Sequence, residues 1–368
     1  MPNALGQPFR IRSLTWSVYL PTFLFAVGQG AVIPIVPLFA RELGASVAVA
    51  GTIVAVRGLG IMFFDVPAGV LITRLGERGA MLVGTGALAV VAVGAAFSPG
   101  PLAFAALMFV MGCAWSIWML ARLSYATEQA PLEHRGRVLS LIGGSNRIGN
   151  FIGPFLGGFA GVAFGLEAAF FLQAALALAA AGTLFFTMVA DGSPPEVHPD
   201  TGHSDAAYKR IFAVVHDHRA VFATAGVASV AIQVLRSSRQ AIIPLWGEHI
   251  GLDAGQIGVI FGLTSAIDMT LFYPVGIMMD RLGRKWAGVP CLLVMSLGML
   301  AIPATANFAG LLLAGLVTGV GNGLGSGINM TLGADFSPAL RRGEFLGVWR
   351  LITDVGTAGG PLVVGALT

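Results

Sequence analysis

Nine charged side chains stand inside long apolar stretches of this sequence, where charge is costly. The arginines are Arg57, Arg122, Arg147, Arg236, Arg239 and Arg350, and the acids are Asp65, Asp268 and Asp354. On insertion scales each costs about 2.5–3.5 kcal/mol at the centre of a membrane helix, so such residues normally face a partner or a polar cavity. A carboxylate beside a guanidinium forms an ion pair, and a carboxylate that gains and loses a proton can couple proton flow to a conformational change.

The elements that carry these charges are predicted to be membrane helices. The chain is 56% hydrophobic and 11% charged, with a mean hydropathy of +0.82, far from the balance of a soluble domain. A helix needs about 20 apolar residues to cross the hydrocarbon core, whereas barrel strands would alternate with period two. Suitable continuous runs occur at 15–39, 48–72, 79–99, 101–126, 137–163, 166–190, 220–245, 255–279, 286–305, 308–334 and 344–366. We therefore expect an all-α integral membrane protein.

The basic residues outside these runs predict the orientation. With the N-terminus inside, most of the 21 Lys and Arg residues fall at cytoplasmic ends, and only Arg41 falls outside. The cytoplasmic group is Arg10, Arg12, Arg74, Arg78, Arg135, Arg137, Lys209, Arg210, Arg219, Arg281, Arg284, Lys285, Arg341 and Arg342. This asymmetry follows the positive-inside rule. It predicts a multi-pass protein of the plasma (bacterial inner) membrane with a cytoplasmic N-terminus.

The sequence offers little support for catalysis. It contains no phosphate-cradling Walker motif, and every histidine lies in a loop or at the end of a span. The linker histidines His198, His203, His216 and His218 match no closed metal site, so a solvated loop is the favoured interpretation. We expect no catalytic residue, metal, cofactor or nucleic-acid partner, and we expect that the protein is not an enzyme.

A single offset of 207 residues aligns the chain with itself. PAGVLITRLGER at 67–78 matches PVGIMMDRLGRK at 274–285, and RGRVL at 135–139 matches RGEFL at 342–346. Such parallel repeats are typical of transporters. They predict an N-terminal six-helix half at 1–190, a cytoplasmic linker at 191–218 and a C-terminal half at 219–368. The counterpart of the sixth span would lie beyond Thr368, so five helices are expected in the second half and the twelfth is missing from this chain.

The linker carries one expected element of its own. Ser204 and Asp205 can cap a short helix that lies at the cytoplasmic interface of the membrane.

Two motifs carry a resemblance to a known family. GIMMDRLGRK at 276–285 resembles the cytoplasmic loop signature of the major facilitator superfamily, which assigns gating roles to Gly276, Asp280, Arg281, Gly283 and Arg284. The resemblance covers essentially the whole chain and implies twelve helices in two parallel halves. In the first half Thr73 and Glu77 depart from the pattern, so we expect the second-half residues to matter more.

The second motif is GNFIGPFLGG at 149–158, which resembles the span-5 motif of the family's antiporters. Its residues are Gly149, Gly153, Pro154, Gly157 and Gly158. The resemblance implies proton-driven efflux. However, GTAGGPLVVG at 356–365 echoes the motif in the second half, and small residues at this spacing also serve close helix packing.

Depth along the helices predicts which intramembrane charges pair. In the family, spans 2 and 11 pack together, as do spans 5 and 8. A rise of about 1.5 Å per residue puts Arg147 level with Asp268 and Asp65 level with Arg350. Arg57 and Asp354 are offset by several Å, within reach of a long arginine. We expect these three pairs to take part in proton coupling. The alternatives are that they only hold helices together, or that Arg350 pairs with Asp354 one turn away on its own helix.

Two arginines have no acid left over and are candidates for substrate binding. Span 7 lines the central cavity in the family, so Arg236 and Arg239 could hold a carboxylate or phosphate. Alternatively, they hydrogen-bond to backbone carbonyls of broken helices. The other candidate lining residues are Gln233, Asn146, Asn150 and Trp118, although the tryptophan could equally pack against lipid or helices.

These observations predict a secondary active transporter that moves a small organic solute by alternating access. Proton-coupled efflux is the favoured mode, and proton-coupled uptake of an organic anion is the alternative. The expected partners are a small-molecule substrate, protons and the lipid bilayer, and the protein is expected to be a monomer.

Overall fold

A computed structural model describes residues 11–187, 212–338 and 341–367 of the chain. The predicted domain boundaries at 190 and 191 lie outside these residues, as do Ser204 and Asp205 of the expected interfacial helix. Residues 212–217, which follow them, are helical. The described part of the chain contains helices and no strand, so the all-α prediction is confirmed.

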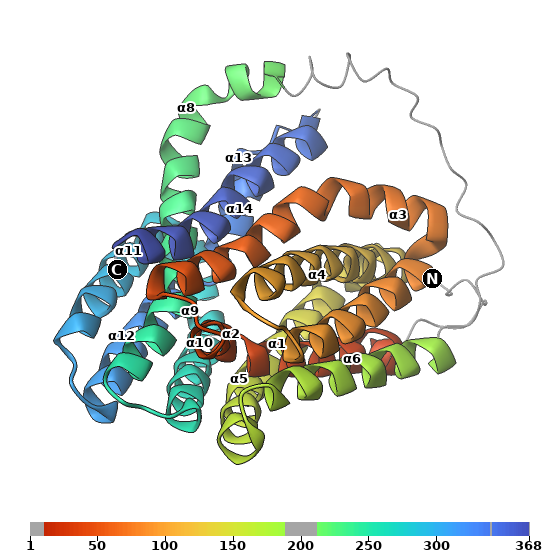
Figure 1. Ribbon diagram of the computed structural model, residues 1–368. Coiled ribbons are helices and arrows are strands. Elements are labelled where there is room, and N and C mark those ends of the chain that lie inside the picture. Colours follow the sequence, from red (N-terminus) through yellow and green to blue (C-terminus); the bar gives the residue numbers. More distant parts are fainter. Residues whose placement is uncertain (1–10, 188–211, 339–340, 368) are drawn as a thin grey trace.

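The helices form two bundles (Figure 1). The N-terminal bundle consists of η1 (Ile11–Leu14), η2 (Thr15–Tyr19), α1 (Leu20–Val32), α2 (Ile35–Glu42), α3 (Val47–Ala96), α4 (Pro101–Gln129), α5 (Leu132–Phe164) and α6 (Ala168–Thr187). The C-terminal bundle consists of α8 (Arg219–Val221), η3 (Phe222–Gly226), α9 (Val227–His249), α10 (Ala254–Leu282), α11 (Lys285–Ala301), η4 (Ile302–Ala304), α12 (Phe308–Leu324), α13 (Ile328–Phe336) and α14 (Arg342–Leu367).

Seven of the described helical segments are long and apolar enough to cross a membrane, or eight if the bent pair Ile11–Val32 and Ile35–Glu42 is one span. One of them, α3, contains two predicted spans that meet at Gly76, whose φ of 70° turns the chain sharply. The predicted spans at 137–163 and 344–366 correspond to α5 and α14, which do not reach the same apolarity because they carry polar and charged residues. The outer surface is apolar, and Leu102 and Phe186 are both 85% exposed, as expected for side chains that face lipid.

Local sequence signals set several helix ends. The Asp253 side chain accepts a hydrogen bond from the backbone N of Gln256, and the Gln256 side chain accepts one from the backbone N of Asp253, which forms a capping box before α10. Ser46 caps α3 in a simpler way by accepting from the backbone N of Val49. A break at Gly325–Gly327 separates α12 from α13, and Gly327 has a φ of 78°. At this break the carbonyl oxygens of Asn322 and Gly325 accept turn hydrogen bonds from the backbone N of Gly325 and of Ile328, and each has a second lone pair for another donor.

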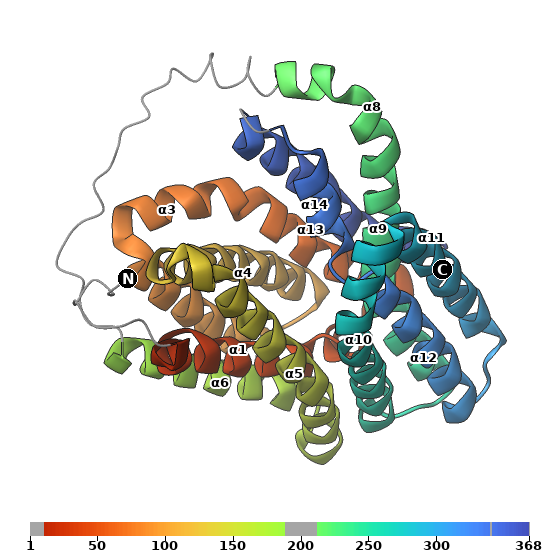
Figure 2. The same cartoon turned by 180° about the vertical axis from the view of Figure 1, so that it is seen from behind.

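The two bundles meet mainly at two helix crossings, where α5 packs against α10 and α3 against α14, with smaller contacts of α9 with α2 and α3. Figure 2 shows α5 beside α10. Glycines make both contacts close, because a Cβ built on Gly258 would lie 3.1 Å from the Cα of Gly158, and one on Gly51 would lie 3.1 Å from the Cα of Gly365. Small residues therefore let the backbones approach at both crossings.

The antiporter-like motif packs α5 against α1 and against α10. A Cβ on Gly153 would lie 2.7 Å from the backbone N of Ala31 on α1, and Gly149 and Gly157 face the same helix, whereas Gly158 faces α10. The echo of this motif in α14 packs against α9 in the same way, since a Cβ on Gly360 would lie 2.9 Å from the backbone N of Ser238. The Gly153 contact with Ala31 and the Gly360 contact with Ser238 correspond, because both residues of the second contact lie 207 positions after those of the first.

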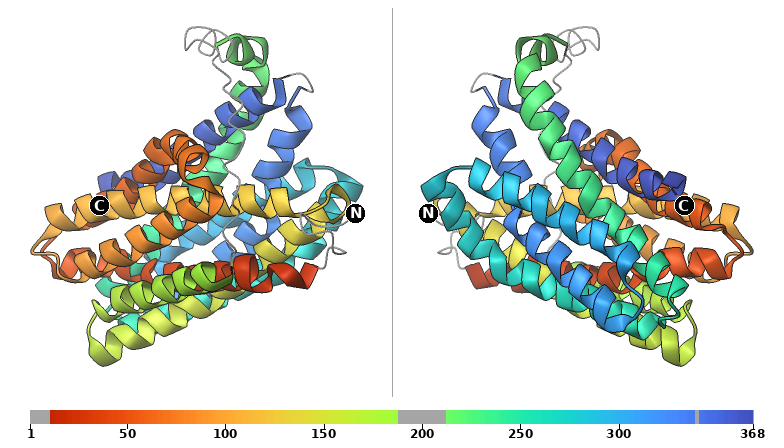
Figure 3. Two further views of the ribbon diagram at one scale, coloured as in Figure 1. Left: turned by 90° about the vertical axis from the view of Figure 1, so that its right-hand side faces the viewer. Right: turned by 90° about the vertical axis from the view of Figure 1, so that its left-hand side faces the viewer.

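The bundles converge at one end and diverge at the other. In Figure 1 the turn between α5 and α6 and the loop between α9 and α10 both lie at the bottom, whereas the bend of α3 lies at the right and α8 at the top. In the side views the segment around α8 projects from the molecule (Figure 3). At the converging end, Arg41 at the end of α2 pairs with Glu248 at the end of α9 (3.4 Å). This pair joins the two bundles at the predicted external side.

Candidate functional site

A cavity of about 250 Å³ lies between the bundles. Its polar lining consists of Gln29, Arg57, Asn146, Asn150, Ser237, Gln240 and Thr357, and its apolar lining of Ile33, Val36, Val54, Gly58, Ile61, Trp115 and Pro361. The residues come from α1, α2, α3, α4, α5, α9 and α14. Both predicted asparagines are present, and Asn150 Nδ2 donates to Asn146 Oδ1 (2.7 Å). Helices of both bundles thus surround one small polar site.

Arg57 is the charged residue of this cavity, and its predicted pairing with Asp354 is wrong. Its Nη2 donates to Gln29 Oε1, whereas Asp354 lies 3.6 Å from Arg350. The helix packing explains the difference, because Gly58 is the residue of α3 that faces α14 here. A Cβ built on Gly58 would lie 3.2 Å from the Cα of Ala358. Arg57 directly precedes Gly58 in α3, so its side chain points toward α1 and the cavity and not toward α14.

Arg147 and Asp268 are brought together at the crossing of α5 with α10. Arg147 Nη1 lies 3.2 Å from Asp268 Oδ2, and Ser326 Oγ donates to Asp268 Oδ1 (2.9 Å) while accepting from Arg147 (3.3 Å). The Arg147 guanidinium also lies 4.2 Å from the ring centroid of Phe272, a favourable cation–π geometry. Each partner of this inter-bundle pair is thus held by further contacts.

A second inter-bundle pair forms at the crossing of α3 with α14. Arg350 Nε lies 3.0 Å from Asp65 Oδ2, and Arg350 Nη2 donates to Asp65 Oδ1 (3.1 Å), so the contact is bidentate. Ser116 Oγ also donates to Asp65 Oδ1. The predicted pair of Arg350 with Asp65 and the alternative pair of Arg350 with Asp354 both form, so one arginine contacts two carboxylates. A second cavity, of about 550 Å³, is lined by these three residues and Glu344 among others.

The predicted substrate arginines do not line the central cavity. Arg236 Nη2 donates to the carbonyl oxygen of Gly325 (2.7 Å) and contacts that of Asn322 (3.5 Å), at the break between α12 and α13. This geometry favours the alternative in which the guanidinium satisfies carbonyls of a broken helix. In the described part of the chain, Arg239 Nε and Nη1 are buried and have no hydrogen-bond partner, and both arginines lie within electrostatic range of Asp268.

Two other predicted lining residues also lie outside the central cavity. Trp118 is 1% exposed and stacks on Phe25 with ring centroids 3.8 Å apart, and Arg122 lies 4.4 Å above its ring. Trp115, one turn earlier on α4, lines the cavity instead. Gln233 Nε2 donates to Thr357 Oγ1 (3.0 Å), which joins α9 to α14.

We expect Arg236→Gln to lower stability and leave solute affinity unchanged. The substitution removes a charge-assisted hydrogen bond from the carbonyl of Gly325, at a cost of about 1.5–3 kcal/mol, but it alters no residue of the cavity. Thermal unfolding of the purified protein measures the first effect, and solute titration measures the second. A loss of solute affinity with an unchanged unfolding temperature would instead show that Arg236 takes part in solute binding.

The predicted gating loop connects three helix ends within the C-terminal bundle. Arg284 contacts Asp280 (3.2 Å) and Asp335 at the end of α13 (2.8 Å), and the hydrogen bond with Asp335 raises the pKa of the Arg284 guanidinium. Gly283 has a φ of 96°, which suits glycine at this turn. Gly276 has open space around it and Arg281 is exposed. These side chains are largely solvated, so the pairs contribute little to stability.

Sequence reasoning missed several residues of these sites. They are Gln29, Ser237, Gln240 and Thr357 in the cavity, Ser326 beside Asp268, Ser116 beside Asp65, Asp335 beside Arg284, and the Arg41 and Glu248 pair. A usable signal existed for the cavity residues, because they are polar side chains within apolar runs. Nothing in a linear pattern, however, states which helices they face.

Two helical bundles around a central polar cavity, with ion pairs across the crossings between them, define a membrane transporter of the two-bundle class. The sequence identifies its family. The family model of the Major Facilitator Superfamily matches residues 18–240 and 221–368, so the chain belongs to that superfamily. It is a secondary transporter and not an enzyme.

Comparisons with individual proteins agree with this assignment. An uncharacterised MFS-type transporter of Methanocaldococcus jannaschii is 22% identical over 353 residues, which are 95% of this chain and 90% of that protein. The multidrug resistance protein MdtG of Salmonella arizonae is 25% identical over 169 residues, 45% of this chain and 42% of MdtG. Among solved structures, the nucleoside transporter NupG has a TM-score of 0.79 at 13% identity, covering 96% of this chain and 91% of its own. A peptide transporter POT in complex with sulfate has a TM-score of 0.78 at 14% identity, covering 99% and 90%.

Proposed function

We propose that this protein exports a small organic solute in exchange for protons by alternating access. The observation that carries the proposal is the pair of charged contacts between the bundles. Asp268 of the C-terminal bundle meets Arg147 of the N-terminal one, and Asp65 of the N-terminal bundle meets Arg350 of the C-terminal one. Any rocking of the two bundles about the cavity must alter these contacts, and protonation of the acids weakens them.

The proposed moving units are the predicted halves, residues 1–190 and 219–368, joined by the linker 191–218 and related by the 207-residue repeat. The recurrence of the Gly153 contact with Ala31 as the Gly360 contact with Ser238 supports the repeat. Convergence of the bundles at the Arg41 and Glu248 pair supports a conformation closed on the predicted external side. The opposite conformation requires that pair to separate.

The proposed proton site is the crossing of α3 with α14. Arg350 there neutralises only one of its two acidic neighbours, Asp65 and Asp354, and Glu344 adds a third carboxylate to the lining of the adjacent cavity. When the contact of Arg350 with Asp65 breaks, Arg350 keeps Asp354 on its own helix as a partner. The inter-bundle contact then weakens without leaving the guanidinium unpaired. Asp268 and Arg147 provide the corresponding contact at the other crossing.

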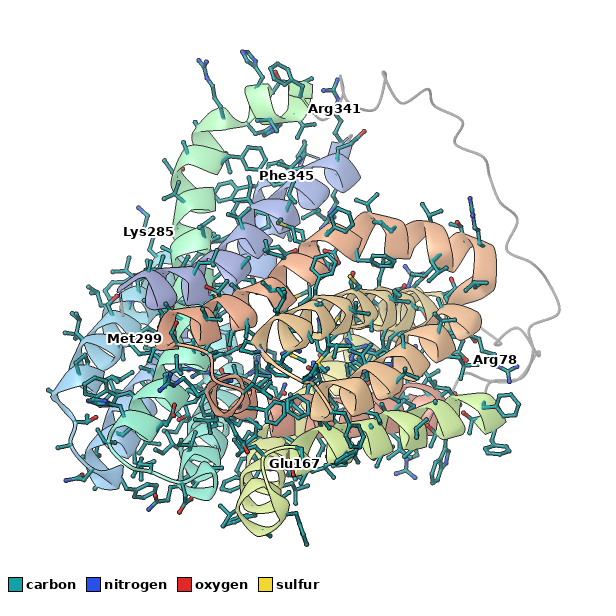
Figure 4. All side chains as sticks on the ribbon, viewed as in Figure 1. Arg78, Glu167, Lys285, Met299, Arg341 and Phe345 are labelled. Carbon is teal, nitrogen blue, oxygen red and sulfur yellow. The ribbon has the colours of Figure 1, made fainter. Side chains whose placement is uncertain are left out.

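The proposed direction and orientation are supported by the similarity to MdtG over part of the chain and by the GNFIGPFLGG motif. Figure 4 places Arg78 at the far end of the N-terminal bundle and Arg341 at the upper end of the C-terminal bundle, whereas Glu167 lies at the bottom. Arg78 and Arg341 thus lie at the diverging ends, which by the positive-inside rule supports a cytoplasmic N-terminus; we propose a bacterial inner membrane as the location. We propose that the monomer is the functional unit.

The second candidate is proton-coupled uptake of an organic anion. It is favoured by a single observation, the presence of Arg57 in the central cavity without an acidic neighbour in its lining.

Flux in proteoliposomes under an imposed pH gradient separates the two modes. Ethidium and benzenesulfonate serve as cationic and anionic probes. We expect the probe that the protein carries to move opposite to the protons, with matching proton movement reported by an internal pH dye. The double variant Asp65→Asn with Asp354→Asn should lose the dependence on the gradient. Solute movement in the direction of the gradient would establish symport, and flux insensitive to pH for both probes would contradict proton coupling.

A further inference from the structure

Arg57 determines the charge character of the central cavity. Each of the other polar side chains that line it is neutral, and the lining contains no Asp, Glu, Lys or His. The hydrogen bond that Arg57 makes is to the amide oxygen of Gln29, also a neutral group. The cavity therefore has a net positive charge before any solute binds.

The other intramembrane acids do not compensate for this charge. Asp268 contacts Arg147, and Asp65 and Asp354 both contact Arg350. Among the residues that the structure describes, none of these acids lies within 4.0 Å of a nitrogen of Arg57. A guanidinium in a low-dielectric interior is strongly stabilised by a counter-ion. An anionic solute can therefore replace the electrostatic stabilisation that water gives to an exposed guanidinium.

The site also has unused hydrogen-bond donors at this position. Arg57 Nε and Gln29 Nε2 are both buried and have no hydrogen-bond partner among the described residues, and they belong to side chains that already contact each other. A carboxylate accepts two N–H donors in fork geometry from a guanidinium edge. Trp115, Ile33 and Ile61 supply apolar lining for the rest of a solute.

We propose that the central cavity selects small organic acids and that Arg57 binds their carboxylate. This inference rests on the proposed function, because it assigns a substrate class to the same cavity. Arg57 also excludes organic cations of the same shape, since a like charge in the cavity is repelled and leaves both donors unsatisfied. The transporter thereby discriminates by charge before it discriminates by shape.

The test compares three probes of similar shape, benzoate, benzyl alcohol and benzylamine, on the purified full-length chain at equal ionic strength and pH 7. Ligands that bind the folded state raise the unfolding temperature. We expect benzoate to raise it in a concentration-dependent manner and benzylamine to leave it unchanged. Arg57→Gln should weaken benzoate binding by about tenfold or more, which corresponds to about 1.4 kcal/mol or more.

Two further variants keep the test decisive if Arg57→Gln folds poorly. Arg57→Lys retains the charge and should retain weaker benzoate binding. Gln29→Glu places a permanent carboxylate beside Arg57 and should abolish benzoate binding while preserving the fold. The control is Arg219→Gln, which removes an exposed arginine at α8 and should bind benzoate as the parent does.

Three results would each overturn the inference. Benzylamine could bind as tightly as benzoate, or Gln29→Glu could leave benzoate binding unaffected. The third is that benzoate fails to raise the unfolding temperature at concentrations up to about 100-fold above a millimolar-range Kd. These outcomes are separable from failure of the proposed function. Benzoate binding through Arg57 without pH-driven flux would contradict proton-coupled transport alone. Conversely, pH-driven ethidium flux that is independent of Arg57 would contradict the anion selectivity alone.

Discussion

Asp268→Asn is expected to destabilise the protein by about 3 kcal/mol and to abolish coupled transport. Breaking a buried ion pair by removing one partner costs about 3–5 kcal/mol, and the lower end applies because the two side chains are 23% and 22% exposed. The substitution leaves Arg147 without its acid and also removes the negative charge near Arg236 and Arg239. Thermal unfolding and proteoliposome flux measure the two effects.

The comparison variant for stability is Asp354→Asn, which is no control for transport because Asp354 belongs to the proposed proton site. It leaves the bidentate contact of Arg350 with Asp65 in place, so its effect on stability should be below about 1 kcal/mol, as for a partly solvated pair. The double variant Arg147→Gln with Asp268→Asn should recover much of the lost stability but not the transport, which separates packing from coupling. Near-parental transport in both aspartate variants would show that these contacts are only structural.

Gly157→Ala is expected to destabilise the protein by about 1–3 kcal/mol through overpacking, and by more if α1 cannot move. A Cβ at this position would overlap the backbone carbonyl of Ala31 and lie 2.7 Å from its Cα. Neither atom is the end of a flexible side chain, so α1 must shift away from α5. The monomer peak in detergent and its unfolding temperature measure the loss.

The control for this prediction is another glycine of the same helix. A Cβ built on Gly143 would have no described atom within 4 Å apart from the backbone of its own helix. Gly143→Ala should therefore leave the unfolding temperature unchanged or raise it slightly, because alanine favours the helical state. If the two substitutions had the same effect, close packing of α5 on α1 would not be the role of the GNFIGPFLGG motif in this chain.

The two inter-bundle ion pairs show how far sequence reasoning reaches. Arg147 with Asp268 and Arg350 with Asp65 could be predicted because the rise per residue gives each side chain a depth along its helix, and the packing of the helices follows from the family. The third prediction, Arg57 with Asp354, failed although the depths allowed it. Depth is a coordinate along the helix axis, whereas contact also requires the correct direction around it.

The same reason explains the exchange of roles between Arg57 and Arg236. Successive residues of a helix point about 100° apart, so a side chain is turned toward a cavity or away from it by the neighbours that its helix packs against. Gly58 against Ala358 turns Arg57 toward Gln29, and the break at Gly325–Gly327 presents carbonyl groups to Arg236. Neither direction can be derived from hydropathy or from spacing.

Composition and patterning by themselves determined that this chain is a helical membrane protein, because apolar runs of spanning length are a property of the linear sequence. The resemblance of its loop motif predicted the major facilitator superfamily, which the family model shows. The rise per residue, together with the family resemblance, predicted the two charge pairs that form at the crossings. Only the tertiary structure decided that Arg57, Gln29 and Ser237 share a cavity while Arg236 and Trp118 lie outside it. A binding site depends on the rotation of several helices about their own axes, and close packing of glycines such as Gly58 sets that rotation.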